Sequence, residues 1–64
     1  MEKETRRVGQ RIREARKAKR VTLVELSQMT GVAQATLSRI ETGVMRGTVE
    51  SHQRIAEALG MSLS

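Results

Sequence analysis

The stretch TLVELSQMTGVAQATLSRIETG, residues 22–43, has the apolar spacing of two short helices separated by a break. Apolar residues recur at helical spacing up to Thr30, and the same spacing resumes at Leu37 and Ile40 on a new axis. Gly31 lies between the two periodic segments, where a glycine is typical of a turn. Two helices joined by such a turn form a helix-turn-helix, whose second helix is presented to a groove.

The outward side of the second helix follows from a helical turn of about 100° per residue. With Ala33, Leu37 and Ile40 facing inward, the remaining positions are small or hydrogen-bonding: Gln34, Ala35, Ser38, Arg39 and Thr42. Such groups read base edges, because Gln pairs with adenine, Arg with guanine and Ser with several bases, while Ala contacts the thymine methyl group. A face that is merely solvated is the alternative. The turn and the charge pattern favour nucleic acid.

Length and composition restrict the class of protein. A chain of 64 residues is long enough for one small domain, residues 1–64, but not for an enclosed active site. It has no cysteine for a disulfide, and His52, its single histidine, cannot build a metal site. Proline and aromatic residues are absent, which predicts an all-α bundle. We expect no cofactor, no membrane span or signal peptide, and a cytoplasmic location.

Positive charge is concentrated at one end of the chain. Residues 1–20 hold nine Lys or Arg and three Glu, whereas residues 21–64 hold three Arg and four Glu. Such a basic pole is typical of proteins that bind a polyanion. A helix lying on an acidic membrane is the alternative, but this segment has no Trp, Phe or Leu to insert. The lack of aromatic rings also argues against single-stranded nucleic acid, so duplex DNA is the favoured partner.

The first helix is predicted over residues 6–19, after a loose start over residues 1–5 in which Thr5 is the candidate N-cap. Its inner stripe consists of Val8, Ile12, Ala15 and the aliphatic stem of Lys19. Gly9 inside this helix costs roughly 1 kcal/mol relative to alanine. A close approach to a neighbouring helix is one possible reason for it.

Capping residues predict where the later helices begin and end. Thr22 and Glu25 have the spacing of a capping box that begins the second helix. The third helix, about residues 33–42, ends at a glycine, and the fourth runs from a Thr48 cap to about residue 59. The inward residues of the fourth helix are Val49, Ile55, Ala56 and Leu59. His52 lies among them, and we interpret it as a partly buried structural residue because no metal-ligating partner accompanies it.

Five short motifs occur together in one order and spacing. They are RIR-x-x-R from residue 11, TL-x-x-L from residue 22, GV at residue 31, LSRIE-x-G from residue 37 and IA-x-ALG-x-SL from residue 55. In this combination the chain strongly resembles the Xre-type family of helix-turn-helix DNA-binding domains, which includes phage lambda-like repressors and Cro proteins, over about residues 8–63. The resemblance implies a compact bundle of four or five helices that binds duplex DNA, often as a dimer on a palindromic operator.

The resemblance also implies roles for individual residues. It assigns DNA base contact to four residues that the helical wheel also places outward, here called the base-contact set: Gln34, Ala35, Ser38 and Arg39. It implies that Arg16 pairs with Glu41 and lies near a DNA phosphate, since a forked guanidinium can serve both anions; an unpaired surface charge is the alternative. Together with residues at helix ends and in the adjoining loop, this arginine makes up a phosphate-contact set: Arg16, Thr22, Thr42 and Arg46.

The sequence departs from the family pattern at five positions. Relatives commonly have Gln, Ala, Ser, Pro and Leu where this chain has Leu23, Ser27, Ala33, Gly47 and His52. A phosphate contact is therefore not expected from residue 23, and the missing cap at residue 33 costs about 1 kcal/mol. Met61 and Leu63 resemble the start of a fifth helix, a region that carries dimer contacts in many relatives. The oligomeric state stays open, and the chain can be the N-terminal part of a longer regulator with a sensor domain.

Two functions from different classes follow. The first is a sequence-specific regulator of transcription that binds a double-stranded DNA operator as a homodimer in a prokaryotic or phage system, with the third helix in the major groove and the basic first helix and loop near phosphates. The second is an antitoxin-like or adaptor module whose main partner is a protein. An enzyme is not expected, because the chain has no nucleophile paired with a base and no phosphate-binding loop.

Overall fold

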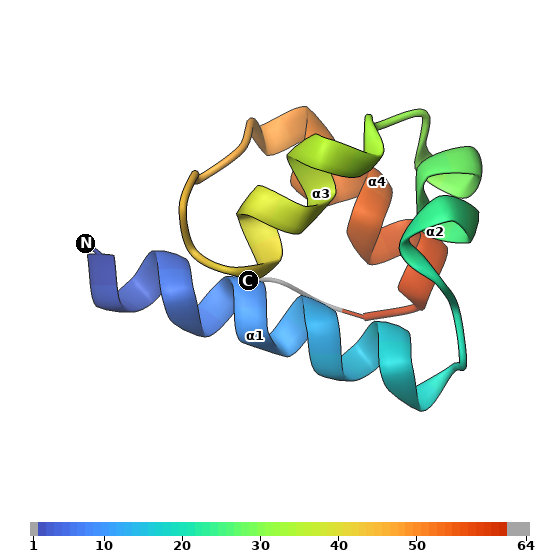
Figure 1. Ribbon diagram of the computed structural model, residues 1–64, viewed down its shortest axis with the longest axis horizontal. Helices are drawn as coiled ribbons and strands as arrows, with labels where there is room; N and C mark the ends of the chain where they lie inside the picture. Colours follow the sequence, from blue (N-terminus) through green and yellow to red (C-terminus); the bar gives the residue numbers. More distant parts are fainter. Residues whose placement is uncertain (1, 62–64) are drawn as a thin grey trace.

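The computed structural model describes residues 2–61, which form four helices and no strand. These are α1 (Glu2–Ala18), α2 (Leu23–Thr30), α3 (Gln34–Glu41) and α4 (Val49–Leu59). Figure 1 shows α1 along one edge of the bundle, with the other three helices on the same side of it. Helix α1 packs against α3 and α4, and α2 packs against the same two helices. The predicted all-α bundle with a central helix-turn-helix, formed by α2 and α3, is confirmed.

The core draws on every helix and on the turn between α2 and α3. Its buried members are Ile12, Leu26, Val32, Leu37, Ile40, Ile55 and Leu59. Val8, Ala15 and Met61 are among the partly buried side chains that pack against it. The predicted stripe of α1 is therefore correct except at its end, because Lys19 is exposed and lies beyond the last helical residue.

Both ends of α1 differ from the prediction. The helix begins at Glu2, so the expected loose start is wrong for residues 2–5, and Thr5 lies inside the helix rather than at its cap. At the other end Arg20 adopts the left-handed conformation, with φ 57°. The N–H of Val21 donates to the carbonyl of Arg16 at 3.0 Å, which is the long bond of a Schellman ending. This ending directs the chain back toward α2.

Two residues predicted to face the core are exposed. Val49 is 76% exposed, since it precedes Ile55 by six residues and therefore points about 120° away from it around the axis of α4. Ala33 is the N-cap of α3 and is exposed, whereas its neighbour Val32 is only 9% exposed and fills the core position. Ala33 precedes the first residue of α3, and Val49 belongs to α4 but lies away from its packed face. Leu63 lies outside the described residues.

Side-chain hydroxyls hold the turn between α2 and α3. The Ser27 hydroxyl donates to the carbonyl of Val32 at 2.6 Å, across the turn. The Thr30 hydroxyl donates to Leu26 at 2.7 Å and accepts from the N–H of Val32 at 3.1 Å. Gly31 between them has φ 74°, which a residue without a Cβ adopts at little cost. These bonds fix the direction in which α3 leaves α2.

Ala33→Ser is expected to raise the free energy of unfolding by about 1 kcal/mol. Ala33 has the extended backbone of an N-cap (φ −58°, ψ 140°) but makes no side-chain capping bond, which a serine oxygen could accept. Ala35→Ser, two residues along in the same helix, is the control and is expected to lower that free energy by about 0.5 kcal/mol. Urea unfolding followed by far-UV circular dichroism measures both. Equal stabilities of the two variants would contradict the capping argument.

Candidate nucleic-acid interface

The base-contact set lies along the side of α3 that the bundle leaves uncovered. Gln34, Ala35 and Arg39 are exposed, and Ser38 is half-buried. The opposite side of α3 is buried against the core through Leu37, Ile40 and Glu41. The helix therefore presents small and hydrogen-bonding groups outward, as the helical wheel predicts. Whether these groups contact bases stays a prediction.

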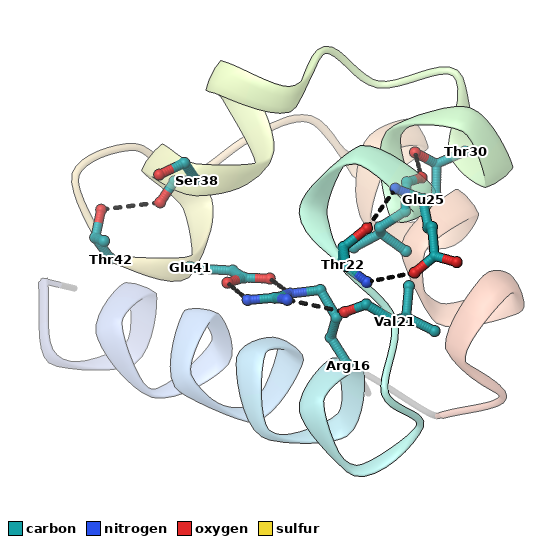
Figure 2. A network of polar contacts seen from close by, with 9 residues as sticks. Arg16, Val21, Thr22, Glu25, Thr30, Ser38, Glu41 and Thr42 are labelled. Atoms are coloured by element: carbon teal, nitrogen blue, oxygen red, sulfur yellow. Dashed lines mark hydrogen bonds and ion pairs between the residues drawn. The ribbon is translucent and has the colours of Figure 1, made fainter.

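A buried ion pair joins α1 to the end of α3 (Figure 2). The Arg16 guanidinium donates to Glu41 twice, from Nε to Oε2 at 2.7 Å and from Nη2 to Oε1 at 3.0 Å. Its Nη1 donates to the carbonyl of Val21 at 2.9 Å. The hydrogen bonds to Glu41 raise the pKa of Arg16 above its usual value, although burial opposes them. The predicted pair is present, and one side chain thereby ties α1, the segment before α2 and α3 together.

These bonds limit what Arg16 can offer to DNA. Its side chain is only 11% exposed, and three of the five N–H groups of a guanidinium are used within the protein. Two N–H groups remain for an outside acceptor. The geometry makes Arg16 first a structural residue, and its phosphate contact stays a prediction.

Gly9 lies where α1 crosses the end of α3. A Cβ atom built at Gly9 would overlap the carbonyl oxygen of Ile40 and would lie 2.8 Å from that of Glu41. The backbones of the two helices are therefore in direct contact at this crossing. The close approach considered as a reason for this glycine is confirmed, and it brings Arg16 within reach of its partner.

The other three members of the phosphate-contact set are exposed. Thr22 is the N-cap of α2, and its hydroxyl oxygen accepts from the N–H of Glu25 at 3.0 Å. The Thr42 hydroxyl donates to the carbonyl of Ser38 at 3.0 Å, at the end of α3. Arg46 lies in the loop between α3 and α4. Thr22 and Thr42 thus lie at helix ends and Arg46 lies in a loop, positions from which phosphates are commonly contacted.

The capping box at the start of α2 is complete. The N–H of Thr22 donates to the Glu25 carboxylate at 2.8 Å, in return for the bond that the Thr22 hydroxyl accepts. Both bonds lower the pKa of Glu25. The bond from the backbone N–H of Thr22 has the larger effect, and the bond with the Thr22 side chain adds to it. The pKa of Glu25 is lower in the folded protein than in the unfolded chain. The capping box therefore stabilises the fold at pH values above the ordinary carboxyl pKa, and this stabilisation is lost as the pH falls through the pKa of the folded state.

His52 is partly buried, as predicted, and has a structural partner. Its Nε2 lies 2.6 Å from the carbonyl oxygen of Arg46. Since a carbonyl can only accept, Nε2 carries the proton and donates it to this bond. The histidine therefore holds the loop that carries Arg46 against α4.

The sequence predicts that the basic first helix lies near phosphates, but Arg16 is the one residue of this helix in the predicted phosphate-contact set. A shallow hollow beside the end of α3 is lined by Arg6, Gln10, Arg13, Glu14 and Lys17 of α1, together with Glu41 and Thr42. Three cations of α1 therefore lie on the side of the molecule that carries Thr42. These three cations are separated by seven and then four residues in the sequence, a spacing that places them on one face of a helix and could have predicted the group.

Within the described part of the chain, no group of three or more His, Asp or Glu side chains could hold a metal ion. None of the helices over residues 2–61 is long and apolar enough to cross a membrane.

Comparison with known proteins agrees with this geometry. The profile of the helix-turn-helix family matches residues 12–64, which is most of the chain. Neither the curated proteins nor the solved structures gave a significant match. The matched region includes α2, α3 and α4 and the C-terminal part of α1, residues 12–18. The chain therefore belongs to the helix-turn-helix family of the Xre and lambda repressor type, a family of DNA-binding regulators rather than enzymes.

Proposed function

We propose that this protein is a sequence-specific regulator of transcription that binds double-stranded DNA with α3 in the major groove. The observation that carries the proposal is the uncovered side of α3, where Gln34, Ala35 and Arg39 are exposed and Ser38 is half-buried. An α-helix fits the major groove, and these side-chain types form hydrogen bonds or methyl contacts with base edges there. The α2–α3 turn and the Arg16–Glu41 pair hold this helix rigidly in place, which favours precise base contact.

Contacts with phosphates would set the position of α3 in the groove. The candidates are the four residues of the phosphate-contact set: Arg16, Thr22, Thr42 and Arg46. Thr22 and Thr42 lie at helix ends, and Arg46 extends from the loop that His52 holds. Such contacts give affinity and orientation without reading sequence, so their loss should affect all duplexes equally.

We further infer a homodimer on a palindromic operator, in the cytoplasm of a prokaryotic cell and associated with its nucleoid. The support is the family, whose members often bind two half-sites related by a two-fold axis. A sensor or effector domain outside this chain is compatible with this arrangement. A palindromic consensus from the selection described next would support the dimer, and a single unrepeated half-site would argue against it.

The antitoxin-like or adaptor alternative has less support. It requires a protein partner on the uncovered side of α3, and that side carries no large apolar side chain. The large hydrophobic residues that are exposed lie outside α3: Val24, Met29, Val44, Met45 and Val49. A partner that co-purifies with the protein and protects α3 from solvent exchange would reverse this preference.

Selection of bound duplexes from a random library, at two salt concentrations, tests the proposal. We expect enrichment of one consensus, and an affinity that falls steeply as salt rises because bound phosphates release counterions. Enrichment of no sequence at either salt concentration would contradict specific binding. A consensus whose affinity does not depend on salt would contradict the phosphate contacts.

Arg39→Ala is expected to reduce discrimination between the selected operator and single-base variants by about 1–3 kcal/mol. The guanidinium can bond two acceptors of a guanine, and alanine cannot. Arg46→Ala is a matched control, because it removes the same charge from an exposed position in the neighbouring loop. It should weaken binding to operator and random duplex alike. Titration of each variant with both duplexes measures this, and an equal loss on both from Arg39→Ala would contradict base contact.

A further inference from the structure

The cations that line the hollow beside α3 form one row along α1. Arg6, Arg13 and Lys17 are all exposed. The row rises about 16 Å along the helix from its first to its last member. We call these three residues the α1 cation row. The row is long enough to meet more than one phosphate, since each DNA strand carries a charge about every 3.4 Å along its axis.

The row lies beside the C-terminal end of α3, next to the last residues of the base-contact set. Thr42 lines the hollow, and its hydroxyl bonds to the carbonyls of Ser38 and Arg39 at 3.0 and 3.2 Å. The hollow therefore begins where the base-contact set ends, at the last turn of α3. A duplex whose major groove holds α3 has a sugar-phosphate backbone along each wall of that groove.

Two carboxylates lie near the row, and the negative charge of one of them is balanced by a buried arginine. Glu41 also lines the hollow, but it is bound by Arg16 in the buried pair. Glu14 lies in the wall with its Oε2 3.4 Å from the Nε2 of Gln10, and it is exposed. With Arg16 counted, cations outnumber carboxylates around the hollow, which therefore favours an anion.

We propose that the α1 cation row binds the phosphodiester backbone of duplex DNA along one wall of the groove that α3 enters. The proposal rests on the proposed function and extends its phosphate-contact set along α1, beyond Arg16. The row contacts no base, so it contributes equally to affinity for every sequence. It also gives α1 a role in orienting α3, because contacts on two elements prevent rotation of the protein about the reading helix.

Arg13→Gln and Arg11→Gln make a matched pair for the test. Both replace an exposed arginine of α1 and remove one charge, but the two positions lie about 160° apart around the helix axis. Loss of one phosphate contact should lower the slope of log affinity against log salt by about 0.9, which is roughly an eightfold loss at 0.1 M salt. We expect this change for Arg13→Gln on operator and random duplex alike, and less than a twofold change for Arg11→Gln.

Glu14→Gln tests the row through a gain of affinity, which a folding defect cannot produce. It removes a negative charge from the wall of the hollow, so we expect it to strengthen binding to both duplexes. Equal effects of Arg13→Gln and Arg11→Gln, or weaker binding by Glu14→Gln, would overturn the backbone contact of the α1 cation row. By contrast, failure of the unaltered protein to bind duplex DNA would overturn the proposed function itself, so the two failures are distinguishable.

Discussion

Arg16→Ala and Glu41→Ala are each expected to lower the free energy of unfolding by about 3–5 kcal/mol. Each substitution leaves the other charge buried without its partner, since the two side chains are only 11% and 4% exposed. Removal of the arginine also leaves the carbonyl of Val21 without its side-chain donor. A domain of this size is rarely stable by more than about 3–5 kcal/mol from its core alone, so both variants should be largely unfolded at 25 °C. Far-UV circular dichroism measures this in a chain without aromatic fluorophores.

The double variant Arg16→Met/Glu41→Leu separates loss of an ion pair from loss of packing. It removes both charges and keeps apolar volume, and such replacements of buried pairs are often neutral or stabilising. We expect its free energy of unfolding to lie within about 1–2 kcal/mol of the unaltered protein. If the single variants each cost less than about 1 kcal/mol, the pair behaves as an exposed salt bridge and the argument from burial fails.

Gly9→Ala is expected to lower the free energy of unfolding by about 3 kcal/mol. On an isolated helix this substitution would be favourable by about 1 kcal/mol. Here the added methyl group would overlap the carbonyl oxygen of Ile40, which is backbone and cannot move aside by a change of rotamer. The crossing of α1 and α3 must therefore widen, which also strains the Arg16–Glu41 pair. Urea unfolding followed by circular dichroism measures the loss.

The control for Gly9→Ala is Arg7→Ala, at an exposed position of the same helix. It should change the free energy of unfolding by no more than about 0.5 kcal/mol. A stability of Gly9→Ala equal to or above that of the unaltered protein would mean that the two helices tolerate a wider crossing. In that case the direct backbone contact would not be needed for the fold.

Much of the candidate site could be predicted from the sequence, because its signals are local. The capping box at Thr22 and the glycine at residue 31 delimit α2, and the spacing of Leu37 and Ile40 defines the buried side of α3. These patterns depend on residues within one or two turns of each other. The uncovered side of α3 follows from them directly.

The errors occurred where local patterns do not decide the outcome. Ala33 lies at the right period from Leu37 but is exposed, and Val49, about 120° from Ile55 around α4, is exposed as well. Which residue of Val32 and Ala33 enters the core depends on the direction in which α3 leaves the turn. The early start of α1 at Glu2 likewise has no capping signal in the sequence.

The sequence by itself determined that the chain is all-helical, where α2, α3 and α4 begin and end, and which side of α3 stays uncovered, because caps and apolar periods act within a few residues. Only the tertiary structure decided that Gly9 meets the backbone of α3, that Arg16 binds Val21 as well as Glu41, and that the cations of α1 flank the end of α3. The reason is physical: a period specifies which residues share one face of a helix. The crossing of two helices, by contrast, depends on how all their faces pack together.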